Sequence, residues 1–163
     1  RNLTIGQGAH WPDTHILRSN GFKVVTAPQF HNLLTMLERN RFDCFLRGVG
    51  EVLIDLQQYS GDRLAVEERL VFTYPMPSYL FVAPDDHRMA KRLSIGLHRA
   101  MLDGDYDEWF TTYFREPIRE LNLMDRVFIP LPNPFLNGEG SPAQLPLLPI
   151  RPDFYLTVPE GTR

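Results

Sequence analysis

Residues 3–51 alternate short apolar runs with segments of helical periodicity, and this alternation strongly limits the folds open to the chain. One segment places apolar residues at i, i+3, i+4 and i+7, which predicts a helix with one apolar face. Strands that alternate with helices pair in parallel, with the helices on the faces of the sheet. We therefore predict an α/β fold with a parallel-rich sheet and flanking helices. The expected strands are 3–5, 22–25 and 42–46, and the expected helices are 11–20 and 28–40.

The second half of the chain is less regular. A helix is expected over 48–58. Further along, two helices are expected in succession, with a break between them at 102–105, where an acidic residue and a glycine interrupt the helical pattern. The second helix of the pair carries Trp109, Phe110, Tyr113 and Phe114 on one side. Beyond Pro132 the sequence is rich in Pro, Gly and Leu, so 132–163 is expected to be an extended tail. Strands are expected at 79–82 and 127–131, and a strand or an extended link is expected at 64–71.

Composition excludes several classes of function. The chain has 163 residues and a net charge of −3, and its basic residues are scattered, so no nucleic-acid or membrane-surface footprint is indicated. Cys44 is the single cysteine, which excludes an internal disulfide framework; in its apolar run it is expected to be a buried small side chain. The sequence shows no signal peptide and no transmembrane run, and composition alone is compatible with an exported or a cytosolic protein.

The turn from Gln7 through Gly8, Ala9 and His10 to Trp11 is the first candidate ligand site. It follows a predicted strand and precedes a predicted helix, and the two glycines are expected to permit a tight turn. Backbone N–H groups at such a helix start point outward, with the helix dipole behind them. In doubly wound sheets ligands bind at this edge. The alternative is that the turn is a plain connection.

Arg47 follows the third predicted strand and is the second candidate, because it reaches the same sheet edge. Gly48 would leave room for a ligand, and Glu51 lies one helical turn beyond Arg47. The alternative is an exposed Arg47–Glu51 ion pair that touches no ligand.

Metal and catalytic sites are not supported by the sequence. His10 and His15 lack a complete ligand set, and no cofactor motif is present. A calcium loop starting at Asp103 fails because its sixth and twelfth positions are Glu108 and Phe114. Hydrolase, metalloprotease and phosphate-loop motifs are also missing. We therefore expect a non-catalytic protein with no cofactor.

Three segments resemble the second half of type II periplasmic solute-binding proteins associated with amino-acid uptake. The first is Ile5-Gly6-Gln7-Gly8-Ala9-His10-Trp11, and the second is Leu37-Glu38-Arg39-Asn40-Arg41-Phe42-Asp43. The third is Tyr79-Leu80-Phe81-Val82 together with 93–114, including the Asp103-Gly104 pair. The resemblance implies a ligand-binding lobe over 1–70, a hinge or crossover over 71–77, and the C-terminal part of the other lobe over 78–131. A missing N-terminal lobe or a second copy would then cover the apolar face of that last part.

Two positions depart from the family pattern. The family places Thr after the turn glycine and an acidic residue after the third strand, whereas this chain has Ala9 and Gly48 there. Arg47 and the turn donors therefore favour a small polar or anionic ligand, with Trp11 stacking on its apolar part. The resemblance implies periplasmic binding for uptake or sensing, with a membrane transporter or receptor as a partner. A sensory module of a receptor, or an enzyme on the same fold, stays an alternative.

Overall fold

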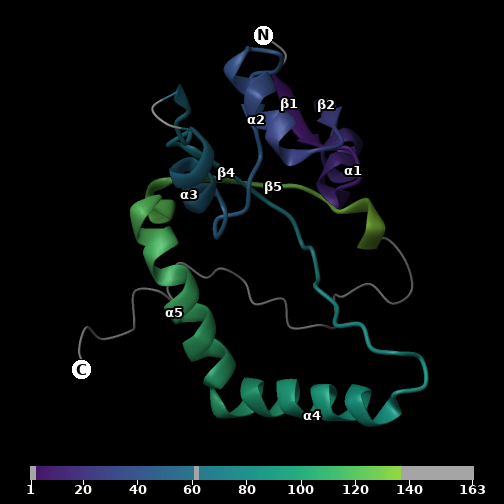
Figure 1. Ribbon diagram of the computed structural model, residues 1–163. Helices are drawn as coiled ribbons and strands as arrows, with labels where there is room; N and C mark the ends of the chain where they lie inside the picture. The colour runs from purple at the N-terminus through teal and green to yellow at the C-terminus, as the bar shows by residue number, and fades with distance from the viewer. Residues whose placement is uncertain (1–2, 61–62, 137–163) are drawn as a thin grey trace.

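The computed structural model describes residues 3–60 and 63–136, which form a mixed α/β protein with two small parallel sheets (Figure 1). The first sheet has the order β2-β1-β3, with β1 over Thr4–Gly8, β2 over Lys23–Ala27 and β3 over Cys44–Phe45. Both pairings with the central strand are parallel, and Ile5 lies opposite Val24 on one side and Cys44 on the other. The parallel α/β arrangement expected for the N-terminal part is thereby confirmed.

Two helices connect these strands and cover the central strand from opposite sides. Helix α1 spans Pro12–Ser19 and contributes Leu17 to a core cluster with Ile5. Helix α2 spans Phe30–Glu38 and contributes Leu33 to a second cluster with Phe42. Successive residues of a strand face opposite sides, so Ile5 meets the α1 layer and Gly6 meets the Phe42 ring of the α2 layer.

The second sheet packs on the first. Strand β4, over Leu70–Thr73, pairs in parallel with β5, over Val127–Pro130. Its residues Phe72 and Ile129 contact the core cluster that holds Ile5 and Leu17, and Leu131 is buried in that same cluster. The end of the described chain therefore returns to the N-terminal sheet. The proposed domain boundaries at 70 and 78 stay a prediction.

A long helical arm, formed by residues 87–103 and 105–120, extends away from both sheets (Figure 1). Helix α3 covers Val52–Asp55 and continues as a π-helical turn over Leu56–Ser60, whereas α4 covers His87–Asp103 and α5 covers Asp105–Glu120. The Asp86 carboxylate accepts the Met89 N–H and caps α4. Gly104 separates α4 from α5 at φ 91°, a conformation that favours glycine. The expected break between these helices is confirmed.

Several expectations about the strands are wrong. Residues 79–82 are not in a strand, because neither sheet of the described chain includes them. A strand requires backbone hydrogen bonds to a neighbouring strand, and this segment has none to any residue that the structure describes. Strand β1 extends to Gly8, so Gly6 and Gly8 are strand residues and not turn residues. Strand β3 has only two residues. The tail prediction is tested only over 132–136, which carry a short 3₁₀ turn at Pro134–Leu136; 137–163 lie outside the described residues.

Candidate ligand-binding edge

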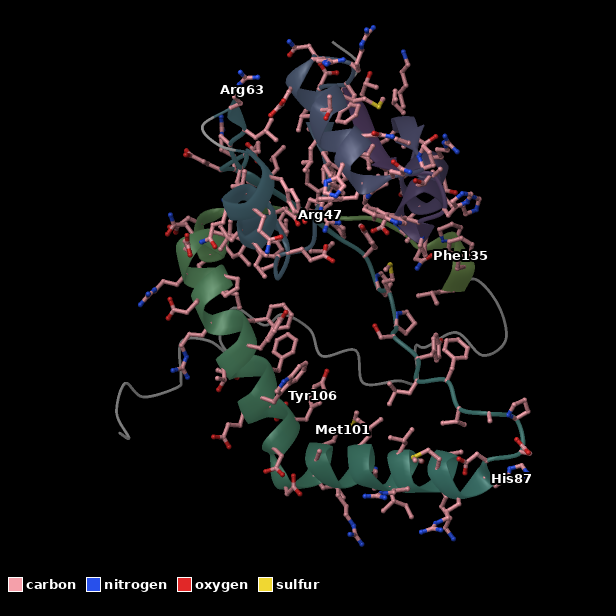
Figure 2. All side chains as sticks on the ribbon, viewed as in Figure 1. Arg47, Arg63, His87, Met101, Tyr106 and Phe135 are labelled. Carbon is pink, nitrogen blue, oxygen red and sulfur yellow. The ribbon has the colours of Figure 1, made fainter. Side chains whose placement is uncertain are left out.

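The carboxyl ends of the parallel strands meet at one edge of the structure, which we call the C-terminal edge. The segment after β1 leads to Trp11, and the segment after β3 leads to Arg47. Tyr74 follows β4 and reaches the first turn of α1, where its hydroxyl donates to the Asp13 carboxylate. Figure 2 shows Arg47 between α3 and the first sheet. Residues from three separate segments thus lie at the strand ends where parallel sheets bind ligands.

Arg47 is held by two carboxylates. Its Nε lies 2.6 Å from Oδ2 of Asp55, and its Nη1 lies 3.2 Å from Oε2 of Glu51. The side chain of Arg47 is only 16% exposed, as is that of Asp55, so this pair is better shielded from water than a surface ion pair. Among the described residues, Nη2 has no partner. The guanidinium therefore keeps one set of donors for a further acceptor.

Three aromatic rings surround the same guanidinium. The guanidinium carbon Cζ of Arg47 lies 5.3 Å from the ring centre of Trp11, 5.0 Å from that of Phe30 and 5.5 Å from that of Phe45. Each distance is within the range of a cation–π attraction. The rings and the carboxylates together restrict the arginine to one position, and we call this group of Arg47, Asp55, Glu51 and the three rings the arginine cluster.

The turn after β1 offers fewer free donors than its sequence suggests. The Gly8 N–H donates to Oε1 of Gln7, the Ala9 N–H to the Ala27 carbonyl, and the Trp11 N–H to the Gly8 carbonyl. Gln7 is 2% exposed, so its side chain belongs to the interior. The expectation that this turn presents a row of outward N–H groups is therefore wrong for these three positions, because the fold itself uses them. His10 is exposed at the turn.

Trp11 packs back onto the strand. A Cβ atom placed on Gly8 would lie 2.3 Å from the Trp11 ring, so the ring rests directly on the glycine. The ring also stacks on Phe45, at 6.2 Å between centres. The close approach of an aromatic ring, and not a turn conformation, explains why position 8 is glycine.

Gly48 lies beside the arginine cluster, in contact with its member Glu51. The Gly48 N–H donates to Oε2 of Glu51 at 3.2 Å, which fixes the carboxylate that also pairs with Arg47. The predicted Arg47–Glu51 pair is present, and Trp11 is close enough to touch the arginine. The structure thus brings together Trp11, Arg47, Gly48 and Glu51, whereas a ligand role for any of them stays a prediction.

Two side chains with raised pKa values stay in their neutral forms at neutral pH: Tyr74 at this edge and Cys44 at the start of β3. Burial and the hydrogen bond to Asp13 raise the pKa of Tyr74 well above its ordinary value. Burial and the nearby carboxylates of Asp43 and Glu67 raise the pKa of the Cys44 thiol. Cys44 packs against the core but is only partly buried, so the expectation of a buried side chain is met only in part. A thiol with a raised pKa is a poor nucleophile.

Sequence reasoning missed Asp55, Phe30, Phe45, Asp13 and Tyr74. Asp55 could have been found from its spacing, because residues four apart lie on the same side of a helix and Asp55 is four residues after Glu51. Nothing local indicated Phe30 or Tyr74, because their contacts join segments far apart in the chain.

Within 3–60 and 63–136, no three His, Cys, Asp or Glu side chains are grouped as a metal site would require. The helices of that same part of the chain include none with the length and apolar character needed to cross a membrane. Comparisons of the chain with protein-family models, with curated proteins and with solved structures found no match.

Proposed function

We propose that this chain is a non-catalytic binding lobe for a small polar or anionic solute, of the type II solute-binding kind, acting in uptake or sensing. In this proposal the arginine cluster is the ligand contact, and Arg47 donates to a carboxylate or a similar acceptor. The periplasmic location and the membrane transporter or receptor partner belong to the same proposal and rest on the resemblance alone.

The position of Arg47 carries the proposal. It stands two residues after β3, at the C-terminal edge, with Asp55 and three rings fixing its orientation. A fixed guanidinium loses little entropy when it binds a planar acceptor, so its hydrogen bonds are worth more than those of a free surface arginine. Nη2 has no partner among the described residues, so it can donate to such an acceptor.

The carboxylates limit which ligands fit. Asp55 and Glu51 together outweigh the single charge of Arg47, and Asp13 adds another negative group at the same edge. Because the cluster is net negative, a neutral polar ligand, or a compact one whose single acceptor group is held by Arg47, is favoured over a polyanion, whose further negative charges would lie near these carboxylates. Trp11 and Phe30 offer apolar contact to the remainder of such a ligand.

Thermal-shift screening of the full chain tests the proposal. Amino acids such as glutamate, monocarboxylates such as acetate, dicarboxylates such as succinate, and the polyamine spermidine are compared with sodium chloride at matched ionic strength. A ligand at a hundred times its Kd adds about 2.7 kcal/mol of stability, which is ~5–11 °C for a chain of this size. A carboxylate that raises the melting temperature supports the proposal. A screen in which only spermidine does so, or in which nothing does, contradicts it.

A further inference from the structure

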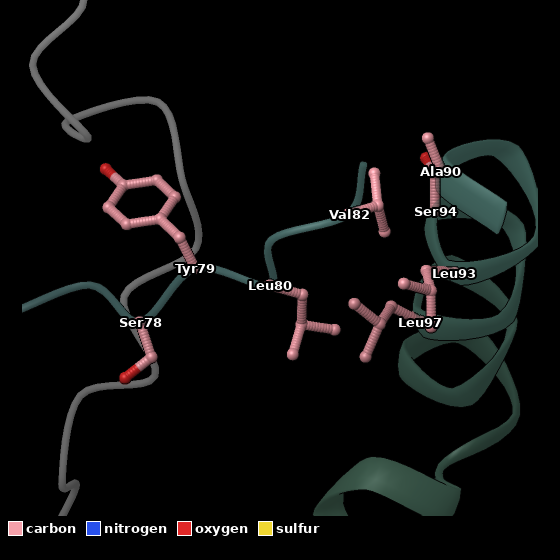
Figure 3. Close-up of a pocket in the computed structure, with 8 residues that line it drawn as sticks. All are labelled: Ser78, Tyr79, Leu80, Val82, Ala90, Leu93, Ser94 and Leu97. Carbon is pink, nitrogen blue, oxygen red and sulfur yellow. The ribbon is translucent and has the colours of Figure 1, made fainter. Parts of the chain in front are cut away.

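An apolar groove lies on the arm, far from the arginine cluster. Tyr79, Leu80 and Val82 form one side of it, and Ala90, Leu93 and Leu97 of α4 form the other. Its volume is about 330 Å³, and Figure 3 shows Leu80 and Val82 facing the α4 side chains across it. We call this feature the arm groove. It is large enough for several side chains of a bound peptide.

The surface around the arm groove is unusually apolar for an exposed region. Phe81 is 93% exposed, and Tyr79 and Leu80 are also exposed beside it. Helix α4 contains no buried residue, although it presents Met89, Leu97 and Met101. Exposed apolar side chains gathered in one region of a protein mark an interaction site.

The end of the described chain lies close to the start of this surface. Nδ2 of Asn133 donates to the Pro75 carbonyl at 2.8 Å, and Nδ2 of Asn20 donates to the Pro132 carbonyl at 2.9 Å. Pro75 precedes Tyr79 by four residues, which span at most ~14 Å. A connecting segment over 137–144 can reach up to ~28 Å, so the residues from Leu145 onward are within reach of the arm groove.

The sequence from Leu145 has the composition that such a groove binds. It reads Leu-Pro-Leu-Leu-Pro-Ile-Arg-Pro, with prolines at 146, 149 and 152. A spacing of three matches the three-residue turn of polyproline II, and the leucines and isoleucine would fall on the other two edges. Proline-rich segments of this type bind grooves that present aromatic side chains; Tyr79 lines the arm groove, and the exposed Phe81 lies two residues further along the same segment.

We propose that the arm groove is the docking site for the chain's own residues 145–152. The short connection holds this segment at a high effective concentration next to the groove, which neither a second copy nor a separate lobe has. Docking would shield Leu80, Leu97 and their neighbours from water. This proposal does not depend on the solute-binding proposal.

Paired cysteines in the full chain test the docking. With Cys44 replaced by alanine, one variant carries Leu148→Cys and Leu97→Cys, and its matched control carries Leu148→Cys and Arg99→Cys. Positions 97 and 99 are both exposed on α4 and are two residues apart, so they lie about 200° apart around the helix. The rate of disulfide formation in a glutathione buffer is measured by mass spectrometry. Each rate is corrected for the reactivity of the single thiols toward a small disulfide reagent.

Docking predicts an intramolecular disulfide between 148 and 97 that forms at least tenfold faster than the one between 148 and 99, independent of protein concentration. Equal rates would overturn the proposal, because a segment that samples all directions reaches both sides of α4. A predominantly intermolecular disulfide would overturn it in favour of a second copy.

A charge placed on the segment gives an independent measurement. In otherwise unchanged full-length protein, Leu148→Asp should increase hydrogen exchange of the α4 amides at least threefold, whereas Gln144→Asp in the connecting segment should not. Unchanged exchange in the Leu148 variant, or the same increase in both variants, would contradict docking at the arm groove.

Discussion

Replacing Gly6 with alanine should destabilise the protein more than any comparable glycine change in the described chain. A Cβ at position 6 would lie 2.2 Å from Cζ of Phe42 and 2.4–2.5 Å from both adjacent ring carbons. The ring must therefore move by more than 1 Å, roughly the shortfall from ordinary contact. Phe42 is only 4% exposed and packs against Ala27 and Leu33, so it has no free space to enter.

Overpacking of this kind costs about 1–3 kcal/mol, and the rigid surroundings of Phe42 place Gly6→Ala near the upper limit. At ~2–4 °C per kcal/mol, the melting temperature should fall by ~6–12 °C. Gly8→Ala meets the Trp11 ring at 2.3 Å, but Trp11 is partly exposed and can yield, so about 1 kcal/mol is expected. Gly96→Ala meets nothing within 4 Å and adds helix propensity, so it should not lower stability.

Urea unfolding followed by far-ultraviolet circular dichroism and by tryptophan fluorescence measures the three variants. We predict the order Gly6→Ala, then Gly8→Ala, then Gly96→Ala, from least to most stable. A Gly6→Ala protein as stable as the parent would refute the packing of Phe42 over β1, and with it the way β1 and α2 meet.

Asp55→Asn leaves the shielded guanidinium of Arg47 with Glu51 as its one carboxylate, so it should lower the free energy of unfolding in urea by about 1–3 kcal/mol. Glu116→Gln, in an exposed ion pair with Arg119, should lower it by about 0–1 kcal/mol. Equal effects of the two substitutions would contradict the burial of the arginine cluster. Tyr74→Phe removes a hydrogen bond to a carboxylate and should cost about 1.5–3 kcal/mol at neutral pH. Because folding raises the pKa of Tyr74, its contribution is fully present below the unfolded-state pKa of ~10 and is lost above it. Parent stability should therefore fall above pH ~10 more steeply than that of Tyr74→Phe, and parallel pH profiles would contradict this assignment.

The parallel sheet could be predicted because its signals are local. Apolar runs alternate with the i, i+3, i+4, i+7 pattern of α2, and strands linked by helices have few ways to pair. The strand expected at 79–82 failed for the opposite reason. Its residues have high strand propensity, but a strand also needs a partner, and no local pattern states whether one is present.

In the candidate site too, contacts between residues close in sequence could be predicted, whereas contacts between distant segments could not. Arg47 and Glu51 are four residues apart, so their ion pair was visible in the sequence. The rings of Trp11 and Phe30 reach Arg47 from separate segments, and these contacts depend on how the layers pack. The free donors expected at the turn were overestimated because Gly8 lies in β1, where its backbone is already engaged.

Ligand binding by the arginine cluster is tested most directly by isothermal titration calorimetry of Arg47 variants. The carboxylate that gives the largest thermal shift is titrated into the parent, Arg47→Ala and Arg41→Ala; Arg41 is an exposed arginine before β3, at the opposite end of the strand. We predict that Arg47→Ala weakens binding tenfold or more, as the loss of a charge-assisted hydrogen bond of about 1.5–3 kcal/mol requires, and that Arg41→Ala binds like the parent. Unchanged affinity in a folded Arg47→Ala protein would contradict the proposed role of the cluster.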